Sequence, residues 1–237
     1  MADNSLIPVF QSVFNVQTGR LHAREVLVRW LKDGRLLGPS EITGPIDWAY
    51  IDTEILGSLS RQGKRFINDR SKLFLNVSVE TLQSDLRFNA WLEQVTAFIA
   101  ATDTELVIEI TELITDRLLD LRWPTLSQVS QVQYAMDDFG DDYSSMQRLI
   151  RYPWNYCKFD ANKIINLRDF GAVLYCVHNQ IEIVAERVEN QTLAESVKSL
   201  GLILQQGFFH ERPKPLDLGV AHSHSSYDTP EINALEA

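Results

Sequence analysis

Cysteine is scarce in this sequence, and its scarcity excludes two classes of protein. Only two of the 237 residues are cysteines, Cys157 and Cys176, and they do not form a Cys-x-x-Cys pair. Two such thiols cannot make a disulfide framework, and their spacing is not that of a zinc or redox site. We expect both to be reduced thiols in the core.

Long hydrophobic runs are also missing. No apolar stretch approaches the roughly 18 residues that a membrane-spanning helix needs, and residues 1–6 lack a basic segment followed by an apolar one. The sequence therefore predicts a cytoplasmic protein with no membrane partner.

Basic residues are outnumbered, with 22 Lys and Arg against 32 Asp and Glu and a formal net charge of -10. Nonspecific binding of nucleic acid depends on many basic contacts that neutralise phosphates. The charge therefore argues against a DNA partner. A small anion differs, because one or two local cations and metal ions can hold it inside an acidic protein. A nucleotide ligand stays possible.

What the sequence does contain is an alternation of short apolar runs with helix-like stretches. Between the first two runs, residues 15–20 have room only for a hairpin turn. We therefore predict a modified TIM (β/α)8 barrel with an antiparallel first strand pair. The predicted strands are 7–14, 22–29, 73–77, 106–110, 132–136, 156–159, 181–185 and 202–205. The predicted helices are 49–61, 88–100, 144–151 with Ser144 as its cap, 170–180 and 191–200.

The periodic pattern ends near residue 213. We expect residues 1–213 to form one barrel domain, and residues 214–237 to be a polar, disordered tail because they are rich in His, Ser and small residues. No second domain or sensory module is recognised in the sequence.

Polar side chains collect where the predicted strands end. In a barrel these ends meet at one mouth, where active sites form. One acidic strand end means little, but several carboxylates buried together cost several kcal/mol unless cations compensate. Oxygen ligands suit magnesium, manganese or calcium, and two metals can activate a water for phosphoryl chemistry. The residues concerned are Asn76, Glu109, Asp137, Asp138, Lys158, Asp160, Glu186 and Gln206, together with Glu25.

Seven ordered segments give these residues a family context. They are EVLVRW, LNVS, EITE, DDFGDDYSS, KFD, AERVE and QGFFHERP, and the match in which they occur runs from about Pro8 to Pro213. In order and spacing they resemble the EAL-domain family, barrel-shaped phosphodiesterases that linearise the bacterial messenger cyclic di-GMP to pGpG. The resemblance implies a cyclic di-GMP phosphodiesterase that needs two Mg2+ or Mn2+ ions and is inhibited by Ca2+. By family analogy it also implies a homodimer.

The resemblance also assigns roles to positions of this sequence. Lys158 matches the lysine that activates water, and with Glu25 and Glu186 it makes the expected catalytic set. Glu112 and Glu189 match supporting glutamates. The implied ligands of the first metal are Glu25, Asn76, Glu109 and Asp137, and those of the second are Asp137, Asp138 and Glu186. The implied substrate-binding residues are Gln11, Arg29, Asp160 and Gln206.

The sequence departs from the family pattern beside the metal ligands. Asp141 and Asp142 stand where the family has a small residue and a glycine, and Arg187 replaces another glycine. We expect Arg187 to pair with Asp141 or Asp142. These departures keep a second reading open, a cyclic di-GMP sensor that does not cleave and signals through an unidentified protein partner. A pure interaction scaffold is disfavoured by the many polar groups at one mouth.

Overall fold

The strands of this protein form one sheet that closes into a barrel. The computed structural model describes residues 5–62 and 71–215. Eight strands close in the order β1-β9-β8-β7-β6-β5-β4-β2, with β2 pairing back to β1, and β3 extends the sheet beyond β2. The described strands are β1 (Ser5–Asn15), β2 (Arg20–Lys32), β3 (Arg35–Leu37), β4 (Lys72–Val77), β5 (Leu106–Ile110), β6 (Val132–Met136), β7 (Tyr156–Asp160), β8 (Glu182–Glu186) and β9 (Leu204–Gln205).

The predicted antiparallel opening pair is confirmed. β1 runs antiparallel to both of its neighbours, β2 and β9, whereas the pairs from β2–β4 through β8–β9 are parallel. The turn between β1 and β2 is tightened by the side-chain oxygen of Asn15, which accepts from the backbone N–H groups of Gln17 and Thr18. Gly19 supplies a left-handed φ of 67° at its end. The fold is thus a (β/α) barrel with one reversed strand.

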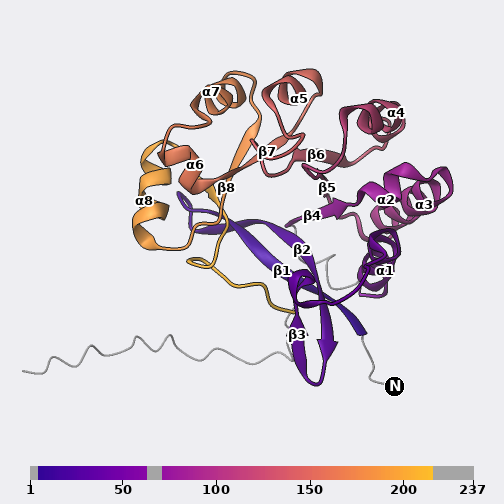
Figure 1. The fold of residues 1–237 in the computed structure, drawn as a ribbon. Coiled ribbons are helices and arrows are strands. Elements are labelled where there is room, and N and C mark those ends of the chain that lie inside the picture. Colours follow the sequence, from indigo (N-terminus) through magenta and orange to yellow (C-terminus); the bar gives the residue numbers. More distant parts are fainter. Residues whose placement is uncertain (1–4, 63–70, 216–237) are drawn as a thin grey trace, which may run out of the picture.

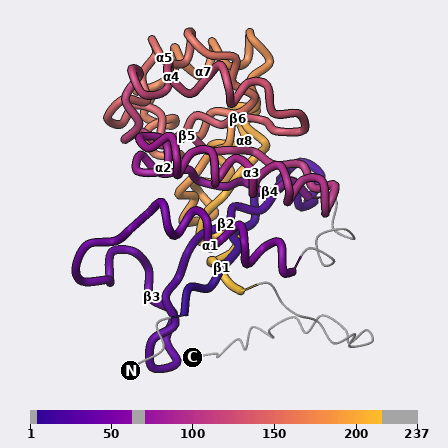
Figure 2. Tube along the Cα trace, turned by 90° about the vertical axis from the view of Figure 1, so that its right-hand side faces the viewer, coloured from indigo at the N-terminus to yellow at the C-terminus, as the bar shows by residue number. Residues whose placement is uncertain are grey.

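Helices cover the outside of the barrel in an arc, and the β2–β3 hairpin extends away from it (Figure 1). Seen from the side, this hairpin lies at the opposite end of the molecule from α5 and α7 (Figure 2). The helices are the 3-10 turn Pro39–Glu41, α1 (Trp48–Arg61), α2 (Val79–Gln83), α3 (Asp85–Thr102), α4 (Asp116–Leu126), α5 (Met146–Arg151), α6 (Ala161–Ile165), α7 (Phe170–His178) and α8 (Gln191–Ser199).

Several of these elements were not predicted from the sequence. They are β3, α2, α4 and α6, of which three are five residues or shorter, too short for a periodic pattern. α4 is longer but carries Pro124 inside it. The predicted cap of α5 was wrong by one residue, because the side chain of Ser145 accepts from the N–H of Arg148. Ser144 instead donates its hydroxyl to the carbonyl of Asp137, at 2.6 Å.

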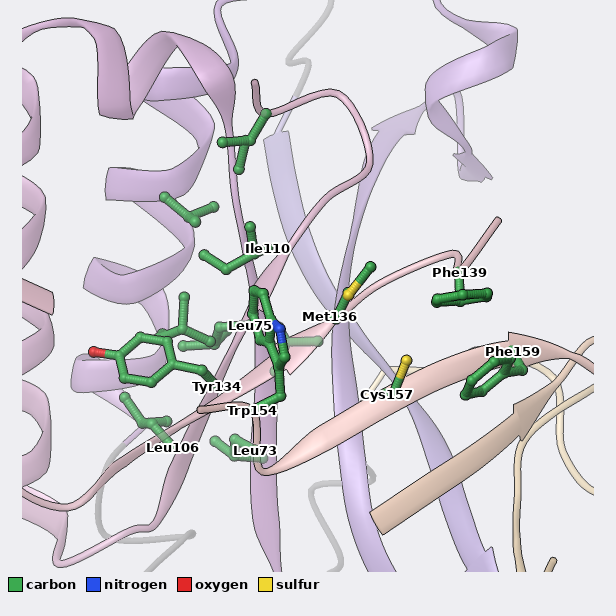
Figure 3. Close-up of a cluster of buried hydrophobic side chains, with 14 of the residues drawn as sticks. Leu73, Leu75, Leu106, Ile110, Tyr134, Met136, Phe139, Trp154, Cys157 and Phe159 are labelled. Atoms are coloured by element: carbon green, nitrogen blue, oxygen red, sulfur yellow. The ribbon is translucent and has the colours of Figure 1, made fainter. Parts of the chain in front are cut away.

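The main core lies between the strands and the helices. Figure 3 shows part of it, where Leu75 of β4, Met136 of β6 and Cys157 of β7 lie among the apolar side chains of the cluster. Cys157 and Cys176 are both free and buried, as predicted. Since successive strand residues point to opposite faces, this outer core uses every second strand position.

The alternate strand positions face the barrel interior and form a second, smaller core. Its members come from eight strands and are 5% exposed or less. This inner core fills the barrel interior toward the amino-terminal ends of the parallel strands. The next inward-facing positions along these strands therefore form the floor of the mouth, at the carboxyl-terminal ends. The inner core consists of Val13, Ala23, Phe74, Val107, Ala135, Tyr156, Val184 and Leu204.

The described chain continues slightly past the predicted domain end. Lys214 exchanges two backbone hydrogen bonds with Phe10 of β1, at 2.7 and 3.0 Å. Residues 216–237 of the predicted tail lie outside the described residues. Within the described ranges, no helix is both long enough and apolar enough to cross a bilayer.

Candidate active site at the barrel mouth

A layer of polar side chains lies directly above the inner core. On each parallel strand, the residue of this layer comes two positions after an inner-core residue. Residues two positions apart on a strand point to the same face, so both lie inside the barrel. On the reversed strand β1 the step runs backwards, from Val13 to Gln11. The layer therefore follows from strand alternation. It consists of Gln11, Glu25, Asn76, Glu109, Asp137, Lys158, Glu186 and Gln206.

Lys158 occupies the centre of this layer. Its side chain is 2% exposed, and its Nζ lies 2.6 Å from Glu109 Oε1 and 2.8 Å from Glu186 Oε1. The distances to Asp137 Oδ1 and Glu25 Oε2 are 3.0 and 3.4 Å. One ammonium group thus faces four carboxylates, three of them from β2, β5 and β8 and the fourth from the residue that follows β6.

Two amide side chains donate hydrogen bonds to Glu25, and a third, Gln11, is bonded to one of them. Gln206 Nε2 donates to Glu25 Oε2 at 2.6 Å, and Asn76 Nδ2 donates to Glu25 Oε1 at 3.3 Å. Gln206 also donates to Gln11 Oε1 at 3.2 Å, while Gln11 donates to the backbone carbonyl of Glu211. Both oxygens of Glu25 are therefore oriented before any ligand binds.

The charges of the layer do not balance. Burial, and then the charge of Glu25, raise the pKa of Glu109 well above its usual range. Burial likewise raises the pKa of Glu186 to about 8, although Lys158 opposes the shift. Burial alone would lower the pKa of Lys158, but Asp137, Glu109 and the other carboxylates outweigh it and raise that pKa. The site has more negative charge than one lysine compensates.

These residues fit divalent metal ions. Both carboxylate oxygens of Glu109 and Oε1 of Gln206 are buried without a hydrogen-bond partner among the described residues. For Glu109, the 2.6 Å contact with Lys158 is an ion pair without hydrogen-bond geometry. Carboxylate oxygens of Glu112, Asp137 and Asp138 also lie within 4.8 Å of one another. Such oxygen donors, short of positive charge, suit hard cations.

The loops after β5 and β6 bring Glu112 and Asp138, respectively, beside the layer. Asp138 has a left-handed φ of 41°, which turns the chain sharply as it leaves the strand. Burial, followed by the negative charge of Asp137, raises the pKa of Asp138; for Glu112, burial is again the main cause of a raised pKa. The loop after β6 is fixed by the Tyr143 N–H, which donates to the Glu112 carbonyl at 3.0 Å. Glu112 thus braces the loop through its backbone.

The substituted positions in this loop are accommodated without Arg187. Asp142 has a φ of 37°, a region that aspartate enters more readily than most residues. Asp141 pairs with Lys163 of α6, at 2.7 Å. The predicted pairing of Arg187 with Asp141 or Asp142 was therefore wrong.

Arg187 instead reaches across the mouth to two other carboxylates. Its Nη2 lies 3.0 Å from Asp138 Oδ1, and its Nη1 lies 3.3 Å from Asp160 Oδ2. Arg187 itself has a φ of 55°, which costs a residue with a Cβ about 1 kcal/mol relative to glycine. Asp160 ends β7, the strand beside β8, and Asp138 comes two residues after β6, the next strand in the sheet.

The mouth opens as a cavity of about 250 Å³ whose walls include most of the predicted site residues. Arg29 is not among them: it lies on the wall of a neighbouring apolar cavity of about 450 Å³, together with Asn76, and donates to the carbonyl of Val28. Asp160 does not line the mouth cavity either, but it pairs with Arg187, which does. The mouth cavity is lined by Gln11, Glu25, Leu27, Asp137, Asp138, Lys158, Glu186, Arg187, Glu189, Gln206, Gly207 and Phe208.

Comparison with known proteins decides the family. The model of the EAL domain matches residues 1–213, nearly the whole chain. The chain belongs to the EAL domain family. The resemblance seen in the sequence is thereby confirmed.

Curated relatives of this EAL domain are longer proteins. The chain is 26% identical to the cyclic di-GMP phosphodiesterase PdeB of Shewanella oneidensis over 232 residues, which is 90% of this chain and 27% of PdeB. It is 28% identical to the cyclic di-GMP phosphodiesterase NbdA of Pseudomonas aeruginosa over 238 residues, 91% of this chain and 30% of NbdA. The chain thus spans less than a third of either relative.

Solved EAL structures share the barrel. The PaMucR phosphodiesterase in complex with c-di-GMP is 26% identical, covers 89% of this chain and 97% of its own, and superposes with a TM-score of 0.71. The Klebsiella pneumoniae BlrP1 complex with manganese and cyclic di-GMP reaches a TM-score of 0.74 at 22% identity, over 90% of this chain and 57% of its own. The second likeness shows the fold alone.

This EAL domain also has mouth residues that sequence reasoning did not select. Leu27 and Phe208 line the cavity, and Phe208 is 52% exposed with the Arg212 guanidinium 4.4 Å from its ring centre. Arg187 was expected beside the metal ligands, but not as the partner of Asp138 and Asp160. Leu27 had a usable signal, since it lies two residues after Glu25 on the same strand face. Phe208 follows the last strand, where no periodicity predicts direction.

Proposed function

We propose that this EAL domain is a metal-dependent phosphodiesterase that hydrolyses cyclic di-GMP to linear pGpG. The observation that carries the proposal is the position of Lys158 among four carboxylates at the barrel mouth, with too little positive charge for the site. In a polar layer with only a structural role, positive and negative charges would balance, because uncompensated buried charge is destabilising. Divalent cations supply the missing charge, and the names of the relatives PdeB and NbdA support the substrate.

The donors divide into two sets around a shared residue, Asp137. When bound, two Mg2+ or Mn2+ ions would lower the pKa of a water and neutralise phosphoryl oxygens. Asp137 would belong to both sets, and this is supported by its ion pair with Lys158 in the polar layer and by the nearness of its carboxylate to those of Glu112 and Asp138. The first set is Glu25, Asn76, Glu109 and Asp137, and the second is Asp137, Asp138 and Glu186.

Lys158 would position the water and the phosphate by donating hydrogen bonds. Its raised pKa keeps the ammonium protonated at neutral pH, so in the metal-free site it is a donor and not a base. Gln206 and Gln11 would fix the direction of Glu25 and offer amide groups to the substrate, together with Asp160. Glu189 and Glu112 would support the loops on either side. Arg29 would contact a phosphate from the adjoining apolar cavity.

The test is turnover by purified protein supplied with manganese or magnesium and cyclic di-GMP. We expect pGpG, separated by chromatography, and loss of product in Glu25→Ala. A matched control is Glu195→Ala, because Glu195 lies on the outer helix α8 and bonds only Gln191 among the described residues. Retained activity in Glu25→Ala would refute the proposed role of Glu25.

A sensor that binds without cleaving is the second candidate, and the pairing of Arg187 with Asp138 favours it, since that carboxylate is needed for the second ion. Calorimetric binding of cyclic di-GMP with no pGpG would select this function and point to a protein partner.

For the enzyme we expect Ca2+ to bind and inhibit, because its larger, looser coordination sphere does not hold the compact geometry that Mg2+ imposes.

We further propose a homodimer. Phe170, Leu174 and Val177 recur at helical spacing along α7 and are 47%, 53% and 62% exposed. Such a stripe of apolar side chains is typical of a contact surface. Sedimentation velocity of the wild type and of Leu174→Glu measures it, and an unchanged monomer in both would contradict the dimer.

A further inference from the structure

Arg187 places a permanent positive charge on the carboxylate that the second metal would use. Its Nη2 is 3.0 Å from Asp138 Oδ1, and its Nη1 is 3.3 Å from Asp160 Oδ2. A guanidinium remains charged at any ordinary pH and has several donors in one plane. It can therefore hold two carboxylates from different loops at once.

In the described part of the chain, the donors of the first metal position are not paired with Arg187, whereas Lys158 contacts carboxylates of both positions. The first-position donors Glu25, Glu109 and Asp137 contact Lys158 and amide groups, and none of them makes an ion pair or hydrogen bond with Arg187 among the described residues. Asp138 differs in being 25% exposed and paired with Arg187. The two halves of the site are thus unequal before any metal arrives.

The backbone around Arg187 directs its side chain to the mouth. The next residue, Val188, is fixed on both sides: its N–H donates to the Gln206 carbonyl at 3.1 Å, and its carbonyl accepts from Phe209 at 3.0 Å. Before it, Glu186 ends β8 with its carboxylate on Lys158. Arg187 is held between these anchors at a φ of 55°, whereas its side chain is 53% exposed and free to turn outward.

We propose that Arg187 is a tethered cation that competes with the second divalent ion for Asp138, so that the site loads its two metals one after the other. The inference rests on the proposed function, because it assumes the two-metal site. The first ion binds without disturbing Arg187. The second binds only when the guanidinium leaves Asp138, so its affinity is lower, and Arg187 sets the metal concentration at which the site is complete.

The experiment is a calorimetric titration of metal-free protein with manganese chloride, without nucleotide. The wild type should show one tighter and one weaker site. Arg187→Gln should strengthen the weaker site by about two- to fivefold, the range of a partly exposed ion pair, and leave the tighter site unchanged. Arg187→Lys should lie between them, because an ammonium cannot bridge two carboxylates as a planar fork does.

Arg187→Gly is a second variant that also relieves the left-handed backbone, so it tests the proposal even if Arg187→Gln folds poorly. The matched control is Arg87→Gln, which removes an exposed arginine paired with Asp47, far along the chain from the mouth. It should bind manganese as the wild type does.

Two results would overturn the proposal, and they differ. Equal affinities of the weaker site in wild type, Arg187→Gln and Arg187→Gly refute the competition but leave the two-metal phosphodiesterase intact. If neither wild type nor variants bind manganese, the competition and the proposed function both fail.

Discussion

The ammonium nitrogen of Lys158 lies 2.6 Å from Oε1 of Glu109, and both side chains are almost completely buried. Glu109 gains no hydrogen bond of good geometry from this contact among the described residues. The pair is therefore held by charge alone, inside a group of three further carboxylates. Replacing Lys158 should destabilise the metal-free protein. Replacing Glu109 should leave that stability unchanged or raise it, but should weaken metal binding.

Replacing Lys158 by methionine should destabilise the metal-free protein by roughly 3–5 kcal/mol, because buried carboxylates lose their one shared cation. The same variant should lose phosphodiesterase activity. Urea unfolding, followed by circular dichroism, measures the first effect. Added manganese should recover most of the lost stability, since divalent ions replace the missing charge. Equal destabilisation with and without metal would show that Lys158 acts through packing.

Replacing Glu109 by glutamine should have the opposite effect on the metal-free protein. Burial and the neighbouring carboxylates raise the pKa of Glu109, so its charged form is costly in the metal-free fold, and we expect the neutral amide to leave stability unchanged or raise it. Manganese affinity should fall, because the proposed first ion loses an anionic ligand. Unfolding with and without manganese measures both effects; a large loss of stability without metal would argue against the charge imbalance.

Stability of the metal-free protein should fall as pH rises from about 4.5 to about 8. In the folded protein Glu186 keeps its proton up to about pH 8, since burial raises its pKa from 4.5. The folded state then binds more protons than the unfolded state, so the free energy of unfolding decreases with pH across this window. Thermal unfolding at several pH values in a chelator measures the slope. Glu186→Gln or saturating magnesium should reduce the slope, with Glu109 and Asp138 contributing the remainder; a slope unchanged in both would contradict this assignment.

Glycine is required at position 207 by the close approach of another backbone segment. A Cβ there would lie 2.2 Å from the Val188 carbonyl oxygen and 2.3 Å from its nitrogen. Gly207→Ala should therefore displace the turn beside Gln206, lower the unfolding temperature and reduce activity. Gly171→Ala is the matched control, because Gly171 lies in α7 with nothing within 4 Å of a Cβ. That change should stabilise the helix by about 0.5–1 kcal/mol.

Arg148 anchors the helix that follows the Asp138 loop. It is fully buried, its Nε lies 2.7 Å from Asp116 Oδ1, and its Nη2 donates to the carbonyl of Ile114. Arg148→Met should cost about 3 kcal/mol and loosen the loop, because Asp116 and the Ile114 carbonyl lose their partner. Hydrogen exchange of residues 138–145 measures the loosening. Arg151→Met is the control, because Arg151 pairs with Asp120 at the surface, 53% exposed.

Much of the barrel and the inner polar layer was determined by the sequence itself. Short apolar or alternating runs mark the strands, and on each parallel strand of the barrel a polar residue lies two positions beyond an inward-facing apolar one. Glu25 and Lys158 were predictable in this way, since alternation along a strand is a local property. Seven ordered motifs then identified the family. Short elements such as α6 and β3 were missed because they are fixed by contacts and not by periodicity.

Only the tertiary structure decided which charges pair. Arg187 was expected to meet Asp141 or Asp142, yet it reaches Asp138 and Asp160, while Lys163 takes Asp141. Spacing along the chain cannot settle this choice, because all these side chains leave loops at the same mouth. The left-handed turns at Asp138 and Arg187 set their directions. Sequence thus determined which residues gather at the mouth, and the loop backbone determined which of them meet, since Coulombic pairing depends on distances that only the folded chain sets.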